Sequence, residues 1–380
     1  MRRVLAALAL ASLLLGGCQT LPRVPYALET LHAASPDYRY NFIEPGTRVR
    51  FLGDIGGVGR EHPSGELQLL PLSGGGANGA YGAGVMYGWG RRGDRPEFDV
   101  VTGVSAGALI APFVFAGSAF DPALREAFTD GRAKNLLRSR GLGALLWPGV
   151  FKPEPLRKLI TNSVTPGLVE AVGAEHRKGR RLYIATTSLD TQTQVVWDMG
   201  ALAQRTDPES RQLFQNILIA SSSIPGVFPP VLLTFERGGQ AVSELHADGG
   251  TVANFFAAGF ARRPDAHHAG GARLHPPQQS DHAAVCVVPV GGLKIIARSF
   301  DTMLKSLTRS ELTNVKLAAS DKGLKLEVGE IPDELDENFL DFSRPHMQAL
   351  FAAGEPQGLA ATAFRTVSPA PVAPLTWRPP

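Results

Sequence analysis

Residues Gly103-Val104-Ser105-Ala106-Gly107 have the G-x-S-x-G form and directly follow the apolar run Phe98–Thr102. Glycines two before and two after the serine let a strand reverse sharply into a helix, and this geometry turns the serine hydroxyl toward solvent. Such a hydroxyl becomes a nucleophile when a neighbouring base takes its proton. The chain contains 42 glycines, so the motif alone is also compatible with an ordinary surface turn.

A second glycine-rich turn, Ser73–Gly79, lies upstream and follows the apolar run Leu67–Leu72. Consecutive glycines let backbone N–H groups converge on an anion, and the helix expected after the turn adds the positive end of its dipole. The turn also matches G-x-G-x-x-G, and dinucleotide-binding folds with this fingerprint place an acid at the end of the second strand. Here that strand ends in the serine turn and Asp99 lies at its start. The sequence therefore favours a hole for a reaction oxyanion.

Asp248-Gly249-Gly250 closes the short strand expected over Val242–Ala247. An Asp-Gly pair by itself is typical of a turn. An aspartate can nevertheless act as the base for a serine if desolvation raises its pKa and hydrogen bonds hold it within reach. Just upstream, residues 220–230 read ASSSIPGVFPP.

With GGGANG, GVSAG, ASSSIPGVFPP and DGG in this order, the chain resembles the patatin-like phospholipase family over residues 67–354. The resemblance implies an α/β fold, a three-layer α/β/α sandwich with a mainly parallel central sheet. It also implies a serine acyl hydrolase that cleaves carboxylic esters of phospholipids or lysophospholipids through an acyl-enzyme. No cofactor or metal is expected.

The resemblance implies a role for particular residues of this chain. The nucleophile is Ser105 and its base is Asp248, which together form a Ser-Asp dyad. The oxyanion hole is formed by Gly74, Gly75, Gly76 and Ala77, and the elbow and DGG motifs are completed by Gly103, Gly107, Gly249 and Gly250. Asn78 stands where the family commonly has Arg or Lys, so the backbone donors are retained but the basic contact with an anionic head group is in question.

The N-terminus resembles a bacterial lipoprotein signal peptide. Arg2 and Arg3 precede an apolar run, Val4–Leu15, that is too short to span a bilayer, and small residues lead to Cys18. Cleavage before Cys18 and its acylation are expected to anchor the chain to a membrane of the bacterial cell envelope. Gln19, rather than Asp, favours the outer membrane. The alternatives are a plain signal peptide with an incidental cysteine and a cytosolic apolar start.

The rest of the chain is organised around one hydrolase domain. The expected divisions are a signal peptide over 1–17, a linker and N-terminal cover over 18–66, the acyl hydrolase domain over 67–354 and a Pro-rich tail over 355–380. Parallel core strands are predicted at Leu67–Leu72, Phe98–Thr102, Arg181–Ser188 and Ala283–Val288. Cys286, in the last of these, is expected to be a buried core residue.

Composition and the loop sequences favour no other class of function. The formal net charge of +3 leaves no nucleic-acid footprint, and the expected partner is membrane lipid. The segment 262–282 contains four histidines, but their spacing matches no compact zinc pattern and favours a loop. The apolar segments Gly141–Phe151 and Ile224–Phe235 are expected to line an acyl pocket, enter lipid or pack on the core.

Two rivals from other classes remain. An α/β-hydrolase carboxylesterase shares G-x-S-x-G but needs a histidine after the acid, for which His282 and His346 are available. His246 lies two residues before Asp248 and, on a strand, shares its face. The second rival is a non-catalytic lipoprotein that keeps the fold for lipid binding or envelope assembly.

Overall fold

The structure is a computed structural model that describes residues 23–56, 58, 67–139, 141, 149–257, 272–274, 292–322, 325–335 and 338–367. Its strands are β1 (Arg39–Asn41), β2 (Leu69–Leu72), β3 (Val100–Val104), β4 (Arg181–Ser188), β5 (Thr193–Asp198), β6 (Val231–Arg237), β7 (Gln240–Asp248), β8 (Ala272–Leu274), β9 (Leu326–Val328) and β10 (Arg365–Thr366). Its α-helices are α2 (Leu28–Ala34), α3 (Thr47–Gly56), α4 (Gly79–Arg92), α5 (Ala106–Ala116), α6 (Asp121–Thr129), α7 (Glu154–Ser163), α8 (Pro166–Arg177), α9 (Met199–Ala203), α10 (Pro208–Ser221), α12 (Gly292–Lys322) and α13 (Arg344–Leu359). Short 3-10 turns are η1 (Gly76–Asn78), η2 (Ser118–Phe120), η3 (Arg132–Asn135), η5 (Gly249–Thr251) and η7 (Asp333–Leu335).

The strands form a single mixed sheet in the order β1-β5-β4-β3-β2-β8-β9-β10, and β7 joins β4 and β6 to the side of this path. The central strands β4, β3, β2, β8 and β9 are parallel. The pairings of β1, β5, β6, β7 and β10 are antiparallel. The expectation of a mainly parallel sheet is therefore wrong for the flanks, because the short connections β4–β5 and β6–β7 can join only antiparallel strands.

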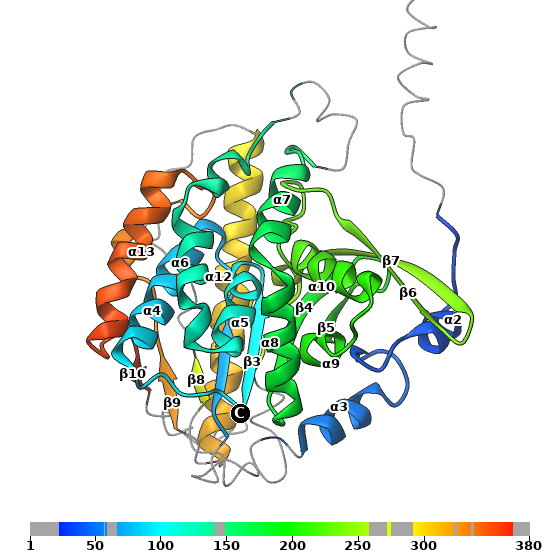
Figure 1. Cartoon of the computed structure of the whole chain (residues 1–380). Coiled ribbons are helices and arrows are strands. Elements are labelled where there is room, and N and C mark those ends of the chain that lie inside the picture. Colours follow the sequence, from blue (N-terminus) through cyan, green and yellow to red (C-terminus); the bar gives the residue numbers. More distant parts are fainter. Residues whose placement is uncertain are drawn as a thin grey trace, which may run out of the picture.

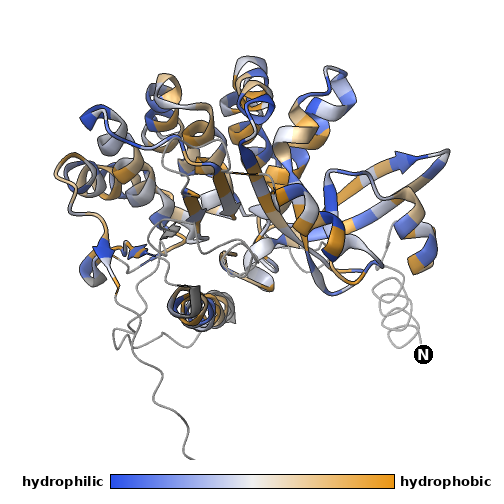
Figure 2. Cartoon of the chain, turned by 90° about the horizontal axis from the view of Figure 1, so that it is seen from below, coloured by the Kyte–Doolittle hydropathy of each residue, from blue (hydrophilic) through white to orange (hydrophobic). Residues whose placement is uncertain are grey.

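Hydrophobic alternation along the strands builds the three layers. Leu70, Val101 and Ile184 point into a core shared with α4, α5 and α10, whereas their neighbours Val100 and Tyr183 point to a second core beneath α3 and α12. Figure 2 shows helices on one side of the sheet and, end-on on the other side, the helix α12 that Figure 1 labels. The α/β/α sandwich is confirmed.

Three of the four expected core strands agree with the structure to within two residues at each end, and the fourth, Ala283–Val288, lies outside the described residues. Arg181–Ser188 coincides with β4, while Leu67–Leu72 and Phe98–Thr102 correspond to β2 and β3. The strand before Asp248 is longer than expected and forms a hairpin with β6 through Gly238 and Gly239, both with positive φ. Two adjacent glycines of this conformation make the tight turn that antiparallel hairpins prefer.

The packed structure continues beyond residue 354, where the Pro-rich tail was expected to begin. That boundary lies inside α13, which packs on α4 backbone to backbone (Figure 1). A Cβ at Gly354 would overlap the carbonyl of Tyr81, and one at Gly84 would overlap the carbonyl of Phe351. Glycines on both helices therefore permit the close approach, and β10 then pairs with β9.

The N-terminal cover is also part of the sheet. Within the described portion of 18–66, β1 pairs with β5 as an edge strand, and α2 and α3 flank it. Cys18, the segment 1–17, His282, Cys286 and most of 262–282 lie outside the described residues. Among the helices described, none combines the length and apolar character needed to cross a bilayer.

Candidate active site

Ser105 occupies a sharp turn between β3 and α5. Its backbone has φ 53° and ψ −123°, and it is one of three non-glycine residues with positive φ in the described part of the chain. A Cβ at Gly103 would lie 2.8 Å from the Cα of Ala108, and one at Gly107 would overlap the carbonyl of Leu72. The turn therefore requires both flanking glycines, and a serine held in this rare conformation marks a functional position.

The side chain of Ser105 faces the protein rather than solvent. The residue is 6% exposed, because Gly74 of the glycine loop packs against it, so that a Cβ at Gly74 would lie 3.1 Å from that of Ser105. The expectation of a solvent-exposed hydroxyl is therefore wrong. The hydroxyl instead donates a hydrogen bond of 2.6 Å to Oδ2 of Asp248.

The sheet explains how residues so distant in sequence meet. β3 ends with Val104 opposite Ala185 of β4, and β7, which runs the other way, ends with Asp248 opposite Thr186. The two strands therefore lie end to end along β4, with their carboxyl ends together. This arrangement brings the elbow and the DGG turn side by side.

Asp248 is buried and held by its own turn. Oδ1 accepts a hydrogen bond of 2.8 Å from the amide of Gly250, and the residue is 1% exposed. Burial raises the pKa of Asp248 to about 7, although the hydrogen bonds from Ser105 and Gly250 act to lower it. A carboxylate with this pKa can take up and release a proton near neutral pH.

Two serines, Ser221 at the end of α10 and Ser223 just after it, hold both residues. Oγ of Ser221 accepts from the amide of Ser105 (3.0 Å) and donates to the carbonyl of Ala185 (2.7 Å). The carbonyl of Ser223 accepts from the amide of Asp248 at 3.0 Å. In the sequence the run Ser221–Ser223 marks the family but does not reveal this positioning role, for which three consecutive serines are the available signal.

Of the four amides of the glycine loop, two donate hydrogen bonds to described residues and two do not. Gly74 N donates to the carbonyl of Asn254 at 3.0 Å, and Ala77 N donates to the carbonyl of Phe339 at 2.8 Å. The amides of Gly75 and Gly76 have no acceptor among the described residues. Of the four residues expected in the oxyanion hole, Gly74 and Ala77 thus fix the loop, and Gly75 and Gly76 offer amides to which no described residue is bonded.

Asn254 links the glycine loop to α12 and was also missed by sequence analysis. Besides accepting from Gly74, it donates from Nδ2 to Thr308 Oγ1 at 2.7 Å. Its side chain lies so close to Gly74 that a Cβ there would be 2.5 Å from Oδ1. Asn254 comes four residues after Gly250 in the sequence, where no recognisable motif distinguishes it.

His246, two residues before Asp248, makes its hydrogen bonds to other residues. His246 is completely buried, with Nε2 at 2.9 Å from Glu244 Oε2 and Nδ1 at 2.9 Å from Thr186 Oγ1. Thr186 Oγ1 also accepts from Trp197 Nε1, so its proton is free to bond Nδ1, and burial lowers the pKa of His246. The network is satisfied by a neutral imidazole. Among the described residues, no histidine hydrogen-bonds Ser105 or Asp248, whereas His282 lies outside them.

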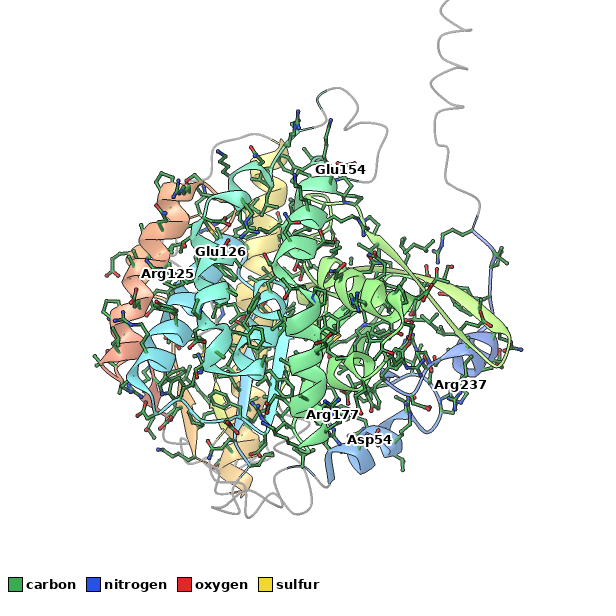
Figure 3. The ribbon with its side chains drawn as sticks, viewed as in Figure 1. Asp54, Arg125, Glu126, Glu154, Arg177 and Arg237 are labelled. Atoms are coloured by element: carbon green, nitrogen blue, oxygen red, sulfur yellow. The ribbon has the colours of Figure 1, made fainter. Side chains whose placement is uncertain are left out.

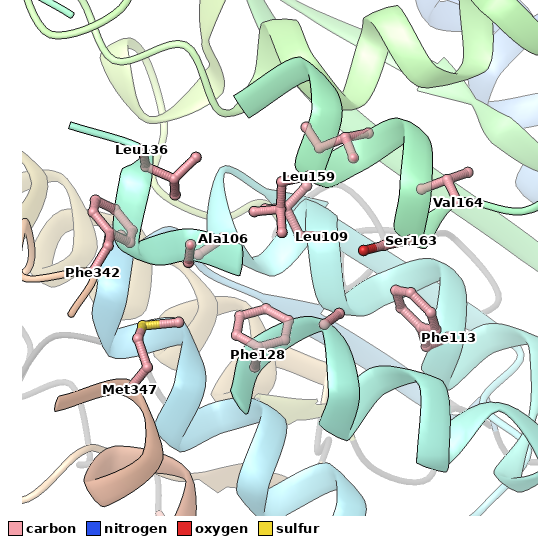
Figure 4. A pocket seen from close by; sticks show the side chains of 14 residues that line it. Ala106, Leu109, Phe113, Phe128, Leu136, Leu159, Ser163, Val164, Phe342 and Met347 are labelled. Carbon is pink, nitrogen blue, oxygen red and sulfur yellow. The ribbon is translucent and has the colours of Figure 1, made fainter. Parts of the chain in front are cut away.

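An apolar pocket adjoins the elbow (Figure 4). Its volume is about 50 Å³, and its wall includes Gly76 of the loop and Ala106, which directly follows the serine. The remaining lining residues are Leu109, Phe113, Ala127, Phe128, Ala133, Leu136, Leu159, Ile160, Ser163, Val164, Phe342 and Met347. Ile224 and Phe228, from one of the apolar segments considered above, instead pack in the core.

A three-layer α/β/α fold with a serine elbow beside an apolar pocket is typical of a serine acyl hydrolase. The family model of the patatin-like phospholipases matches residues 70–261, which is half of the chain. This part contains the glycine loop, the elbow and the DGG turn. The chain belongs to the patatin-like phospholipase family, and it is a lipid acyl hydrolase.

Other comparisons are more distant. The crystal structure of VipD from Legionella pneumophila is similar at a TM-score of 0.38 and 13% sequence identity, covering 80% of this chain and 68% of that one. A search of curated proteins gave no match.

Proposed function

We propose that the protein hydrolyses carboxylic esters of phospholipids or lysophospholipids with Ser105 as nucleophile and Asp248 as its base. The observation that carries the proposal is the 2.6 Å hydrogen bond from Ser105 Oγ to a buried carboxylate whose pKa burial raises to about 7. Nucleophile and base are thus in contact, and the base has the proton affinity that the transfer needs near neutral pH.

In the first step Ser105 Oγ attacks the ester carbonyl while its proton passes to Asp248 Oδ2. The negative charge that develops on the carbonyl oxygen is met by the amides of Gly75, Gly76 and Ala106, the last at the start of α5. None of the three has an acceptor among the described residues. Each such donor is worth roughly 3 kcal/mol of the barrier. Protonated Asp248 then returns its proton to the leaving alcohol.

In the second step water releases the acyl group from Ser105. Asp248 takes a proton from the water, and the same amides stabilise the second tetrahedral intermediate. The proton finally returns to Ser105, so the dyad is regenerated without a cofactor.

The apolar pocket is the proposed acyl site, since it begins at Gly76 and Ala106 on the two sides of the proposed oxyanion hole. Its volume of about 50 Å³ holds only a short acyl chain, so a long chain requires side chains of the wall to move. Leu159→Ala should widen it and raise the ratio of dodecanoyl to butanoyl ester turnover. An unchanged ratio would place the acyl site elsewhere.

The test of the proposed chemistry is to offer purified protein a panel of phospholipid, lysophospholipid and p-nitrophenyl esters and to label it with a fluorophosphonate. We expect turnover and a single label, both abolished by Ser105→Ala, and turnover abolished by Asp248→Asn. His246→Ala or His346→Ala, in a folded protein, should leave substantial activity. Loss of activity in either histidine variant would favour the carboxylesterase triad. No turnover with any ester would favour a lipid-binding protein.

We further propose that Cys18 is acylated and anchors the protein in the cell envelope, on the outer membrane. The support is the sequence around Cys18, where a short apolar run ends in small residues and Gln19 follows. Cys18→Ser should abolish partition into the detergent phase. A processed variant that still partitions there would be held by another surface.

A further inference from the structure

The segment between Gly131 and Ser163 carries an unusual concentration of positive charge. It contains a single acidic residue, Glu154, against seven basic ones, which are Arg132, Lys134, Arg138, Arg140, Lys152, Arg157 and Lys158. The formal charge of the whole chain is only +3, so the remainder of the chain is net acidic. Positive charge is therefore gathered on one part of the molecule.

Most of these cations are exposed and unneutralised. Lys134, Arg138, Lys152 and Lys158 form no ion pair within the described residues, and Arg157 donates to the neutral amide oxygen of Asn216 at 2.8 Å. Arg132 differs, because it is paired with both Glu126 and Asp130. Five cations that have no ion pair in the part of the chain that the structure describes thus face solvent here.

The cations belong to one continuous surface. α7 packs on η3, and the amide of Lys152 donates to the carbonyl of Arg138 at 3.0 Å. The exposed Arg344, at the start of α13, extends its aliphatic part along Gly131. We call this surface the basic rim; it consists of Lys134, Arg138, Lys152, Arg157, Lys158 and Arg344.

The same elements that carry the rim also form the wall of the apolar pocket. On α7, Arg157 and Lys158 face solvent, while Leu159 and Ile160, one step further along the helix, line the pocket. On η3, Lys134 is exposed, and its neighbour Ala133 is buried in the pocket wall. α7 and η3 therefore each present positive charge to solvent and an apolar face to the pocket.

We propose that the basic rim docks on the anionic head groups of a lipid bilayer and so brings the pocket to its substrate. The inference rests on the proposed function and names the surface from which that site takes its lipid. A bilayer offers both parts of this arrangement, since phosphate charge meets the rim and acyl chains meet the pocket. A nucleic acid would use the charge alone, which makes it the less complete match. The rim also supplies basic side chains that the glycine loop lacks at Asn78.

The test is vesicle sedimentation with the full chain carrying Ser105→Ala, so that lipid is bound without turnover. Phosphatidylglycerol–phosphatidylcholine vesicles are compared with phosphatidylcholine alone, because a lipid anchor contributes equally to both. Binding should favour the anionic vesicles and fall as salt rises. Lys134→Gln with Lys158→Gln should weaken binding to them roughly 10- to 30-fold.

The matched control is Arg48→Gln with Arg177→Gln, which also removes two exposed cations that have no ion pair among the described residues. Arg177 lies toward the opposite end of the molecule from Glu154 and α7 (Figure 3). This control should bind as the parent does. Equal binding to both vesicle types, or equal losses in the two double variants, would overturn the inference.

Two further readouts separate the alternatives. Displacement from anionic vesicles by a DNA duplex at equal phosphate concentration would assign the rim to nucleic acid and overturn the proposal. Hydrolysis of soluble p-nitrophenyl butyrate by the chain with intact Ser105 tests the chemistry alone. Ester hydrolysis without docking would refute only the rim, whereas docking without ester hydrolysis would refute only the proposed function.

Discussion

Asp248 is buried in a place where its charge is unfavourable, although the proposed reaction needs that charge. Its pKa is raised to about 7 by burial, whereas an aspartate in an unfolded chain ionises near pH 4. Between these two pH values the folded chain holds a proton that the unfolded chain has released. Stability contributed by this group is therefore present at low pH and is lost as pH rises toward 7.

Asp248→Asn should consequently stabilise the protein at alkaline pH while abolishing acylation. Asparagine does not ionise, so it avoids the cost that the buried carboxylate carries above its pKa, and it cannot take the proton of Ser105. Urea unfolding at pH 5 and pH 8 measures the effect. We expect the free energy of unfolding of the variant, relative to wild type, to increase between the two pH values. A difference that does not change with pH would contradict the raised pKa.

The same pKa sets the pH dependence of the reaction. Because Asp248 acts as a base only when it is ionised, kcat/KM for a soluble ester should rise through pH 7 and level off above it. His246 should not contribute a second step, since burial lowers its pKa and both ring nitrogens are bonded. Rates measured from pH 5 to 9 check this. A rate that is already constant at pH 5 would show that the base has an ordinary carboxyl pKa.

Ser221 provides a test of positioning. Ser221→Ala removes the acceptor for the amide of Ser105 and the donor to Ala185, and thereby the support of a backbone in a rare conformation. We expect kcat to fall about tenfold with little change in KM, because a lost hydrogen bond of this kind costs about 1–2 kcal/mol. Ser210→Ala, near the start of the same helix, is the control. Equal kcat in the two variants would remove Ser221 from the positioning role.

At the scale of elements, α4 and α13 depend on contact between their backbones. Gly354→Ala would place a methyl group against the carbonyl of Tyr81, and the helices would have to separate. We expect a loss of about 1–3 kcal/mol in the free energy of unfolding. Gly167→Ala, where a Cβ meets nothing within 4 Å, should leave stability nearly unchanged. Similar values for the two variants would show that the helix contact adapts without cost.

The elements that sequence could predict are those that local chemistry determines. Two turns are determined by residues that are adjacent in sequence, namely Gly103–Gly107 and Asp248-Gly249-Gly250. Each follows a strand, and both lie where expected. α13 was missed because Gly354 and Gly358 resemble a loop until α4 is seen to need them. The antiparallel flanks were missed for a similar reason, since strand direction follows from connections that the family resemblance did not describe.

The site shows the same division. Ser105 and Asp248 come from motifs that can be read locally, and the structure brings them together. Ser221 and Asn254 act through bonds to the backbone of residues far away in sequence, so their side chains carry no local sign of this use. The engaged amides of Gly74 and Ala77 likewise depend on carbonyls contributed by distant segments.

At the scale of the whole molecule, a buried ion network ties the N-terminal segment to the strand that ends in Asp248. Arg39 of β1 is completely buried, pairs with Glu44, and donates to Glu244 of β7 at 2.7 Å. Burial raises the pKa of Glu244, but the hydrogen bonds from His246 and Ser188 and the charge of Arg39 outweigh burial and hold that pKa below its usual range. The expected N-terminal cover is therefore electrostatically part of the hydrolase domain.

Arg39→Met should destabilise the protein by about 3–5 kcal/mol at pH 7, because it leaves Glu44 and Glu244 buried without a cation. The sign of the pH dependence follows from those carboxylates. In the wild type, Glu244 stabilises the fold above its unfolded pKa and this contribution is lost as pH falls, whereas in the variant the orphaned carboxylates are relieved by protonation. The difference in unfolding free energy between variant and wild type should thus shrink between pH 7 and pH 4.

Arg237→Met, which breaks an exposed pair with Asp37, is the control, and its free energy of unfolding should change little at either pH. Urea titrations of both variants measure these values, and a loss no larger in Arg39→Met than in Arg237→Met would mean that the N-terminal segment is held by its apolar contacts alone.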